Sequence, residues 1–366
     1  MSNKRYVPHP GVYIKNTIDD LGITQTEFAN RVGLTNKNLS TLISGESNIT
    51  FEVANRLANY FNNSVEGWIN LQIKYEMYKN EESKLEELKE EWNIVKLFDK
   101  DFIKQITNKE ITYSFDEKLI VLFRKIFNVS SLINLKKKDF YACYKTSIKK
   151  DLSEKNIILR NAWISLAEQY SRDINVMPFD KKEILKHIDY LKSLTLKGEE
   201  AFNGEIQAFL ETVGIKLVIL PYLKNSNISG VTKWNPSNQS VMIAINDYGK
   251  TIDKIWFTLF HELGHAIKNH KRNFTISFLK SKDTNEEEIE ANNFAASSLI
   301  NQKAYEEFIN IGDFSLESIN EFAIKNNVAN YIVVGRLQND RYIGYNEYNF
   351  TKINCFIAQS DKFFNL

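Results

Sequence analysis

Cysteine is almost absent from this sequence of 366 residues, which contains only Cys143 and Cys355. Two cysteines so far apart predict no disulfide framework and fit a reducing compartment. No segment approaches the ~20 consecutive apolar residues of a membrane span, and no apolar run follows a basic start. We therefore expect a cytoplasmic protein without membrane contact. A net charge of +1 gives the chain as a whole no attraction to nucleic acid.

Histidine is scarce too, yet two of the five histidines form the motif His261-Glu262-Leu263-Gly264-His265. One helical turn separates the two imidazoles, so both project from one face and can hold one Zn²⁺. Glu262 lies beside that face, where it can take a proton from bound water and pass it to a leaving amine. The flanking residues are apolar, and buried imidazoles need partners, which favours a metal site over two packing histidines. Gly264 weakens a helix by up to ~1 kcal/mol relative to Ala, so another backbone or a substrate should approach closely there.

A catalytic zinc site needs a third protein ligand and an open fourth position. The next predicted helix begins with four carboxylates: Glu286, Glu287, Glu288 and Glu290. Thr284 would cap this helix together with Glu287, and acids in a first turn suit the helix dipole. The face of Glu288 differs because it carries only small residues, namely Ala291, Asn292 and Ala295. We predict Glu288 as the third ligand, with Glu290 as the alternative, and Asn292 as a hydrogen-bond partner of a ligand. His270, at the far end of the metal helix, is interpreted as a partner of the helix dipole.

A short sheet is predicted just before the metal helix. A helix over 205–213 is followed by apolar, β-branched segments at 215–221, 228–234 and 240–246. The last two should pair as a hairpin, because turn-forming residues at 235–238 separate them. One edge of this sheet can border the metal cleft, where an extended substrate chain can add by backbone pairing.

Glycines and capping residues divide the first 72 residues into five predicted short helices. The predicted N-caps of the last four helices are Thr24, Thr35, Thr50 and Ser64. The Glu27 side chain should reach back to the backbone of Thr24 and complete a capping box. Two short helices joined by a tight glycine turn within a five-helix unit are typical of a helix-turn-helix.

The second helix of this pair, residues 36–43, should expose amides and hydroxyls that suit base edges and phosphates. The predicted DNA contacts are Gln25, Thr35, Asn36, Lys37, Asn38, Ser40 and Thr41. Up to Leu71 the basic residues are balanced by acidic ones, so charge supports DNA binding only weakly. A helical bundle used for protein contacts is the alternative.

The middle of the chain, residues 79–200, shows no arrangement of catalytic side chains. The charged segment from Tyr75 to Asp99 favours a connecting helix that can pack against a second copy of itself. Residues 115–200 should continue as helices, with Ile120 and Phe123 in a core and an amphipathic stretch at 161–168.

Several N-terminal motifs resemble those of the HigA-type antitoxins. They are His9-Pro10-Gly11, the segment 22–29, Leu39-Ser40, Ile43-Ser44-Gly45 and the segment 68–72. These antitoxins are Cro/repressor-like helix-turn-helix proteins that bind an operator as dimers. The resemblance covers nearly all of residues 8–78. It implies a DNA-binding domain over 1–78, a homodimer and a possible toxin partner.

The C-terminal part resembles the ImmA/IrrE family of gluzincin-like zinc metallopeptidases, some of which cleave repressor proteins. The segments that carry this resemblance are 256–265, 288–296 and 333–338. It implies a metallopeptidase domain over 201–366, with zinc ligands His261, His265 and Glu288 and with Glu262 as the general base. One departure concerns residues 298–301, which read Ser-Leu-Ile-Asn where the family often has Leu-Leu-Met-Pro.

The sequence thus predicts a mostly α protein: a five-helix DNA-binding domain, a helical middle and a small α+β metallopeptidase domain. The expected function is that of a DNA-binding regulator with a zinc endopeptidase, which cleaves a regulatory partner protein or itself. The alternative is a repressor or antitoxin whose metal site is structural or sensory, and which acts by binding operator DNA and a toxin. An intact Glu262 argues against this alternative, because a structural site needs no base.

Overall fold

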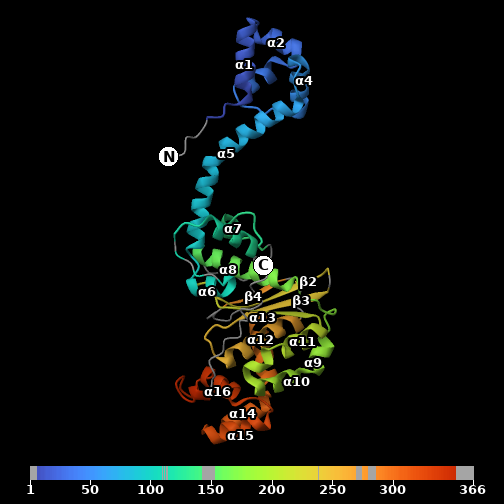
Figure 1. Cartoon of the computed structure of the whole chain (residues 1–366). Helices are drawn as coiled ribbons and strands as arrows, with labels where there is room; N and C mark the ends of the chain where they lie inside the picture. Colours follow the sequence, from blue (N-terminus) through green and yellow to red (C-terminus); the bar gives the residue numbers. More distant parts are fainter. Residues whose placement is uncertain are drawn as a thin grey trace. The chain divides into compact units, whose positions relative to one another are not determined.

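The computed structural model describes residues 6–108, 110, 112, 114–141, 153–237, 239–268, 274–278 and 286–351. The chain divides into two compact units, Met1–Glu90 and Glu91–Leu366 (Figure 1). Each unit has its own hydrophobic core.

The N-terminal unit is helical and is drawn in blue in Figure 1. Its first helices are α1 (Pro10–Leu21), α2 (Gln25–Val32), α3 (Asn36–Ile43) and α4 (Phe51–Phe61). The predicted caps are confirmed, since the hydroxyls of Thr24, Thr35 and Thr50 each accept a backbone N–H in the first turn. Only one of the two hydrogen bonds of the predicted capping box is found in this described segment, from the Glu27 N–H to the Thr24 hydroxyl. The Glu27 side chain pairs instead with Arg31, one turn further on.

The fifth helix of this unit is longer than predicted. Helix α5 (Val65–Val95) runs without interruption through the segment that the sequence analysis divides into a fifth helix and a connecting helix. The division was wrong because residues 72–75 contain neither glycine nor proline and so offer nothing that would end a helix. The side chains that α1 to α5 share form a small core, which includes Ile14, Phe28, Leu39 and Trp68.

A mixed sheet lies at the centre of the C-terminal unit. Its strands are β1 (Ile215–Leu220), β2 (Ile228–Asn235), β3 (Ser240–Asn246) and β4 (Phe274–Phe278). They are arranged in the order β1-β3-β2-β4, with β1 parallel to β3 and the other pairs antiparallel. The predicted β2–β3 hairpin is confirmed. Strand β4 was not predicted, and it pairs with the free edge of β2. The sequence predicted only that one edge of the sheet, not specified further, would border the metal cleft.

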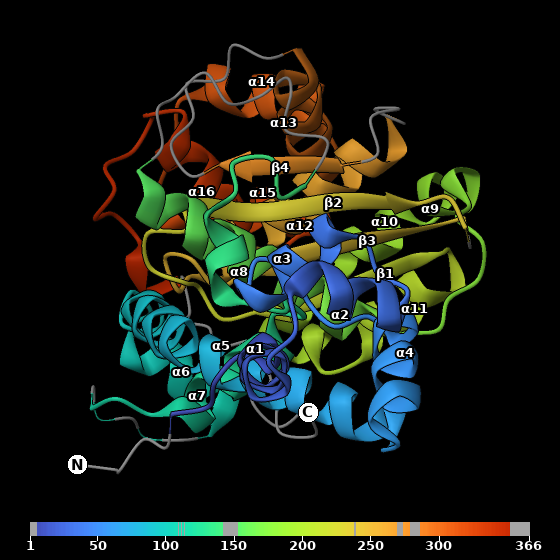
Figure 2. The same cartoon turned by 90° about the horizontal axis from the view of Figure 1, so that it is seen from above.

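Helices cover both faces of this sheet, as Figures 1 and 2 show. Before the sheet come α6 (Lys100–Thr107), α7 (Glu117–Ile126), η1 (Leu132–Lys136), α8 (Glu154–Ser171), α9 (Lys181–Lys186), α10 (Ile188–Ser193), η2 (Leu194–Phe202) and α11 (Glu205–Thr212). Helix α8 packs between η1 and the strands β1 and β3. Its residues 157–167 are consequently buried all round, and the amphipathic prediction for this stretch was wrong.

The opposite face of the sheet carries α12 (Ile252–Ile267), which contacts β2 and β3. After β4 come α13 (Glu286–Leu299), α14 (Gln302–Ile311), α15 (Leu316–Lys325), α16 (Asn330–Asn339) and η3 (Asn349–Thr351). The predicted fold class, mostly α with a small α+β domain, is confirmed. Over the described ranges, no helix is both long and apolar enough to cross a lipid bilayer.

Candidate metal centre

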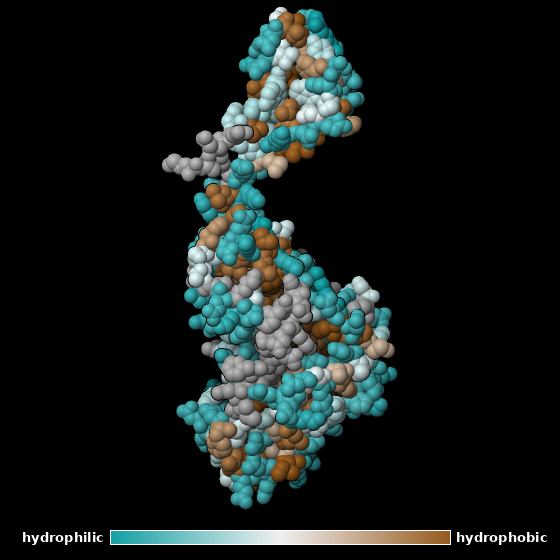
Figure 3. Space-filling model, in the orientation of Figure 1, coloured by the Kyte–Doolittle hydropathy of each residue, from teal (hydrophilic) through white to brown (hydrophobic). Residues whose placement is uncertain are grey.

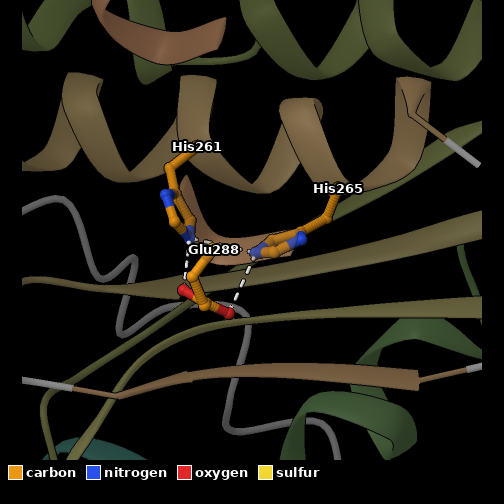
Figure 4. Close-up of side chains that lie close together, drawn as sticks. All are labelled: His261, His265 and Glu288. Atoms are coloured by element: carbon orange, nitrogen blue, oxygen red, sulfur yellow. Dashed lines mark hydrogen bonds and ion pairs between the residues drawn. The ribbon is translucent and has the colours of Figure 1, made fainter. Parts of the chain in front are cut away.

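Three predicted ligands meet between α12 and α13 (Figure 4). The Nε2 atoms of His261 and His265 lie 3.0 Å apart. The two carboxylate oxygens of Glu288 lie 3.3 Å from these nitrogens, one oxygen to each imidazole. Glu290, the predicted alternative, is exposed on the same helix and does not join this cluster.

Close packing of the two helices brings Glu288 to the histidines. A Cβ atom added at Gly264 would lie 3.0 Å from the Cα atom of Ala291 and 3.2 Å from its carbonyl oxygen. Ala291 and Ala295 are fully buried against α12. The expectation that Gly264 admits another backbone is confirmed, and the small-residue face of α13 explains why Glu288 points inward.

Asn292 orients the first histidine. Its Oδ1 atom lies 2.8 Å from Nδ1 of His261, so a hydrogen on Nδ1 leaves Nε2 free to bind a metal. This contact matches the predicted place of Asn292 beside a ligand. Imidazoles that bind metals generally donate their other N–H in this way, which fixes both the tautomer and the orientation of the ring.

Glu262 is wholly buried directly behind the histidine face. Its Oε2 atom accepts a hydrogen bond of 2.6 Å from the hydroxyl of Thr232 on β2. Its Oε1 atom is buried and has no hydrogen-bond partner among the described residues. A Cβ atom at Gly230 would lie 2.3 Å from this Oε1, so β2 accommodates the carboxylate only because residue 230 is glycine.

The electrostatics of the cluster favour a cation beside Glu288. Burial raises the pKa of the Glu288 carboxyl group, but the two imidazoles outweigh this and lower the pKa to about 2. Burial lowers the pKa of His261, whereas the hydrogen bond to Glu288 and the charge of Glu262 raise it above its ordinary value. Glu288 therefore carries its negative charge at any ordinary pH and attracts positive charge to this point.

These residues fit a zinc ion. Zinc binds tetrahedrally at ~2.0–2.1 Å, which places its ligand atoms roughly 3.3 Å from one another. The three distances of 3.0 to 3.3 Å between donor atoms come close to that spacing. The donor set of two imidazoles and one carboxylate is also that of known catalytic zinc sites. Next to the first histidine in the sequence, Glu262 has a buried carboxylate oxygen that no described residue hydrogen-bonds.

A cavity of about 930 Å³ adjoins the cluster. Its walls come from α12, α13 and α16 and include Phe257, Asn292 and Arg336. Asn292 lines this cavity and also contacts His261, whereas the residues of the cluster itself do not line the cavity. It is large enough to hold side chains of a bound peptide.

The predicted DNA contacts lie on α2 and α3 in the other unit. Gln25, Thr35, Asn36, Lys37, Asn38 and Ser40 are exposed, and Thr41 is half-buried. Two hydroxyls are used within the domain. That of Thr35 caps α3, and that of Thr41 donates to the carbonyl of Asn38 and accepts from the hydroxyl of Ser47. The exposed side chains of Asn36, Lys37, Asn38 and Ser40 form a polar face on α3.

Sequence reasoning missed the contribution of the sheet to the metal centre. Ser277 on β4 places its Oγ atom 3.1 Å from Nε2 of His261. The alternation of apolar and polar residues in β4 was the available signal for a strand there. The positions of Gly230 and Thr232 next to Glu262 could not be predicted, because they depend on the register of β2 in the sheet. Thr284 and His270, the predicted helix cap and dipole partner, lie outside the described residues.

Two family models match the chain. Residues 14–68 match the model described as helix-turn-helix, and residues 210–331 match a peptidase family model described as the IrrE N-terminal-like domain. The chain therefore combines a helix-turn-helix domain with an IrrE-like domain. The two resemblances recognised from the sequence motifs are confirmed at this level.

Two curated proteins are similar to about a fifth of this chain. Virulence-associated protein A' of Dichelobacter nodosus is 42% identical over 71 residues, which are 19% of this chain and 62% of that protein. The HTH-type transcriptional regulator YddM of Escherichia coli K12 is 29% identical over 76 residues, 21% of this chain and 81% of that protein. The chain thus spans less than two thirds of the length of the first of these relatives.

Two solved structures are also similar to this chain. One is a putative antidote protein of a plasmid maintenance system from Nostoc punctiforme, 32% identical, with a TM-score of 0.23. The matched region is 24% of this chain and 94% of the chain of that structure. The other is an addiction module antidote protein of the HigA family from Coxiella burnetii, 22% identical, with a TM-score of 0.23. The matched region is 24% of this chain and 95% of the chain of that structure.

Proposed function

We propose that this protein is a DNA-binding regulator with a zinc-dependent endopeptidase centre, which cleaves a regulatory partner protein or itself to change gene expression. One observation carries the proposal above all. The fully buried Glu262 has one carboxylate oxygen that accepts no hydrogen bond from any residue in the described part of the chain, beside two histidines and a carboxylate. An unpaired buried oxygen costs folding free energy, which a purely structural metal site has no reason to accept.

The residues of the centre have distinct roles in the proposed reaction. Zinc at His261, His265 and Glu288 would polarise the scissile carbonyl and acidify a water molecule. Oε1 of Glu262 takes a proton from that water and delivers it to the leaving amine. The hydroxyl of Thr232 holds the other oxygen of Glu262, so Oε1 is the one left to carry the proton.

The N-terminal unit would deliver this activity to a promoter. Its helix-turn-helix match and the polar face of α3 support binding to operator DNA. Helix α5 exposes Ile73 and Met77 one turn apart, which supports pairing of two copies as a homodimer. Figure 3 shows such apolar patches within a surface that is otherwise largely hydrophilic. A toxin bound by this unit would be a natural partner, since the motifs of this unit resemble those of the HigA-type antitoxins.

The test is to incubate the zinc-loaded protein with the product of the adjacent gene and with a second, active-site-inactivated copy of itself. Wild type and Glu290→Gln, which removes a charge from the exposed side of α13, should produce fragments identified by mass spectrometry. Glu262→Gln should produce none while it still binds zinc and operator DNA. Equal cleavage by Glu262→Gln would refute the assigned base. Operator binding by all three proteins without any cleavage would support a repressor with a structural metal site.

A further inference from the structure

The metal centre is closed by the chain itself. Exposure is 6% for His261, 0% for Glu262 and 2% for His265, and 14% of the Glu288 side chain is exposed. A scissile carbonyl must approach within roughly 3 Å of such groups to react. It cannot do so while the centre is covered. Among the described residues, β4 at the edge of the sheet contributes a side chain to this enclosure.

Strand β4 directs one hydroxyl into the centre. Ser277 is only 3% exposed, and its Oγ atom lies 3.1 Å from Nε2 of His261. Ser277 is paired in register with Gly230, the residue against which Glu262 packs. Ser277 is therefore the cross-strand neighbour of the glycine against which the proposed base packs.

The contact between Ser277 and His261 involves the nitrogen that would bind zinc. A neutral imidazole with its hydrogen on Nδ1 has one lone pair at Nε2. This lone pair cannot accept a hydrogen bond and bind a metal at the same time. With a metal ion between the imidazoles, the Ser277 oxygen would lie within reach of the ion rather than of the nitrogen. It would be the fourth donor in a tetrahedral set.

We propose that Ser277 is the fourth protein group of the metal centre and that β4 thereby holds the centre closed. This inference rests on the proposed metal site, but not on peptidase activity. Opening requires β4 to withdraw Ser277 from the centre. An extended peptide that replaces β4 at the edge of β2 would gain the same backbone hydrogen bonds and bring its own carbonyl to the vacated position.

The first experiment asks whether residue 277 reaches the metal. The full-length protein is loaded with one Co²⁺ per chain, and absorption spectra are recorded for wild type, Ser277→Cys and Ser297→Cys. A thiolate bound to Co²⁺ produces an intense charge-transfer band in the near ultraviolet, and thiolates are strong ligands for such ions. We expect this band in Ser277→Cys alone. Ser297 is an exposed residue of the helix that carries Glu288, so its variant controls for an added thiol.

The second experiment measures closure without any new ligand. Acetohydroxamate, a small metal chelator, is titrated into the Co²⁺ forms of wild type, Ser277→Ala and Ser297→Ala. Loss of a donor that competes for the fourth position should tighten acetohydroxamate binding about tenfold or more in Ser277→Ala only. A cobalt-loaded Ser277→Cys without the band, or equal acetohydroxamate affinities in all three proteins, would overturn the proposal. If the band appears but Ser277→Ala, which lacks the closing side chain, cleaves none of the candidate substrates, the proposed peptidase function fails instead.

Discussion

The polar face of α3 and the candidate metal centre differ in how they are built. The polar face of α3 comes from consecutive residues of one short helix whose side chains point to solvent. The metal centre collects buried side chains from β2, α12, β4 and α13, between residues 230 and 292. On the exposed face of α3, a substitution should affect little beyond the contacts of the substituted side chain itself. In the metal centre, each side chain depends on several others, so a single substitution should have larger and more widely shared effects.

The largest expected effect is the loss of a metal ligand. Structural zinc sites bind with about 12 kcal/mol, so removal of one of three protein ligands should weaken binding by roughly 4 kcal/mol, or about a thousandfold. We expect this for Glu288→Ala in a competition titration with a zinc chelator. Glu290→Ala, two residues away and exposed, should bind zinc like wild type. If Glu290→Ala weakened zinc binding and Glu288→Ala did not, the assignment of Glu288 as the third ligand would be wrong.

A smaller effect is expected one step away from the metal. Asn292 bonds the Nδ1 atom of His261 and does not belong to the ligand cluster. Asn292→Ala should weaken zinc binding by ~10–100-fold, the usual range for a residue that orients a ligand. The neighbouring Asn293→Ala serves as the control, since Asn293 is exposed. A thousandfold loss in Asn292→Ala would show that the amide binds the metal directly.

The difference between the two regions also explains what the sequence could predict. Caps such as Thr24 and Thr35 act within three residues, so their pattern is visible in the chain. The two histidines share a helical face for the same local reason, and small residues on one face of α13 singled out Glu288. Ser277 could not be found in this way. Its place depends on which strand pairs with β2 and in which register, and no local pattern encodes that pairing.

On α3 the expected effects are smaller and confined to DNA binding. Each phosphate contact adds about 0.9 to the magnitude of the salt-dependence slope, and its loss lowers affinity about eightfold at 0.1 M salt. Lys37→Ala should therefore weaken operator binding by about that factor and reduce the slope by about 1. Lys15→Ala, an exposed change on α1, is the control. Both proteins should bind zinc as wild type does. An unchanged slope for Lys37→Ala would remove this lysine from the interface.

The smallest expected effect separates stability from recognition within α3. Thr35 is a predicted DNA contact, yet its hydroxyl accepts the Asn38 N–H and caps the helix. Thr24 caps α2 in the same way, through the N–H of Glu27. Loss of either cap costs about 1 kcal/mol, so Thr35→Ala and Thr24→Ala should each speed local amide hydrogen exchange about fivefold.

These two variants then separate the two roles of Thr35. If Thr35 acts only as a cap, Thr35→Ala and Thr24→Ala should weaken operator binding equally and slightly. If Thr35 also contacts DNA, operator affinity should fall further in Thr35→Ala, and Thr35→Ser should restore it together with the cap. Zinc affinity should remain unchanged in all of them, because no residue of α2 or α3 belongs to the metal cluster. A change in zinc affinity would instead show that the two regions are energetically coupled.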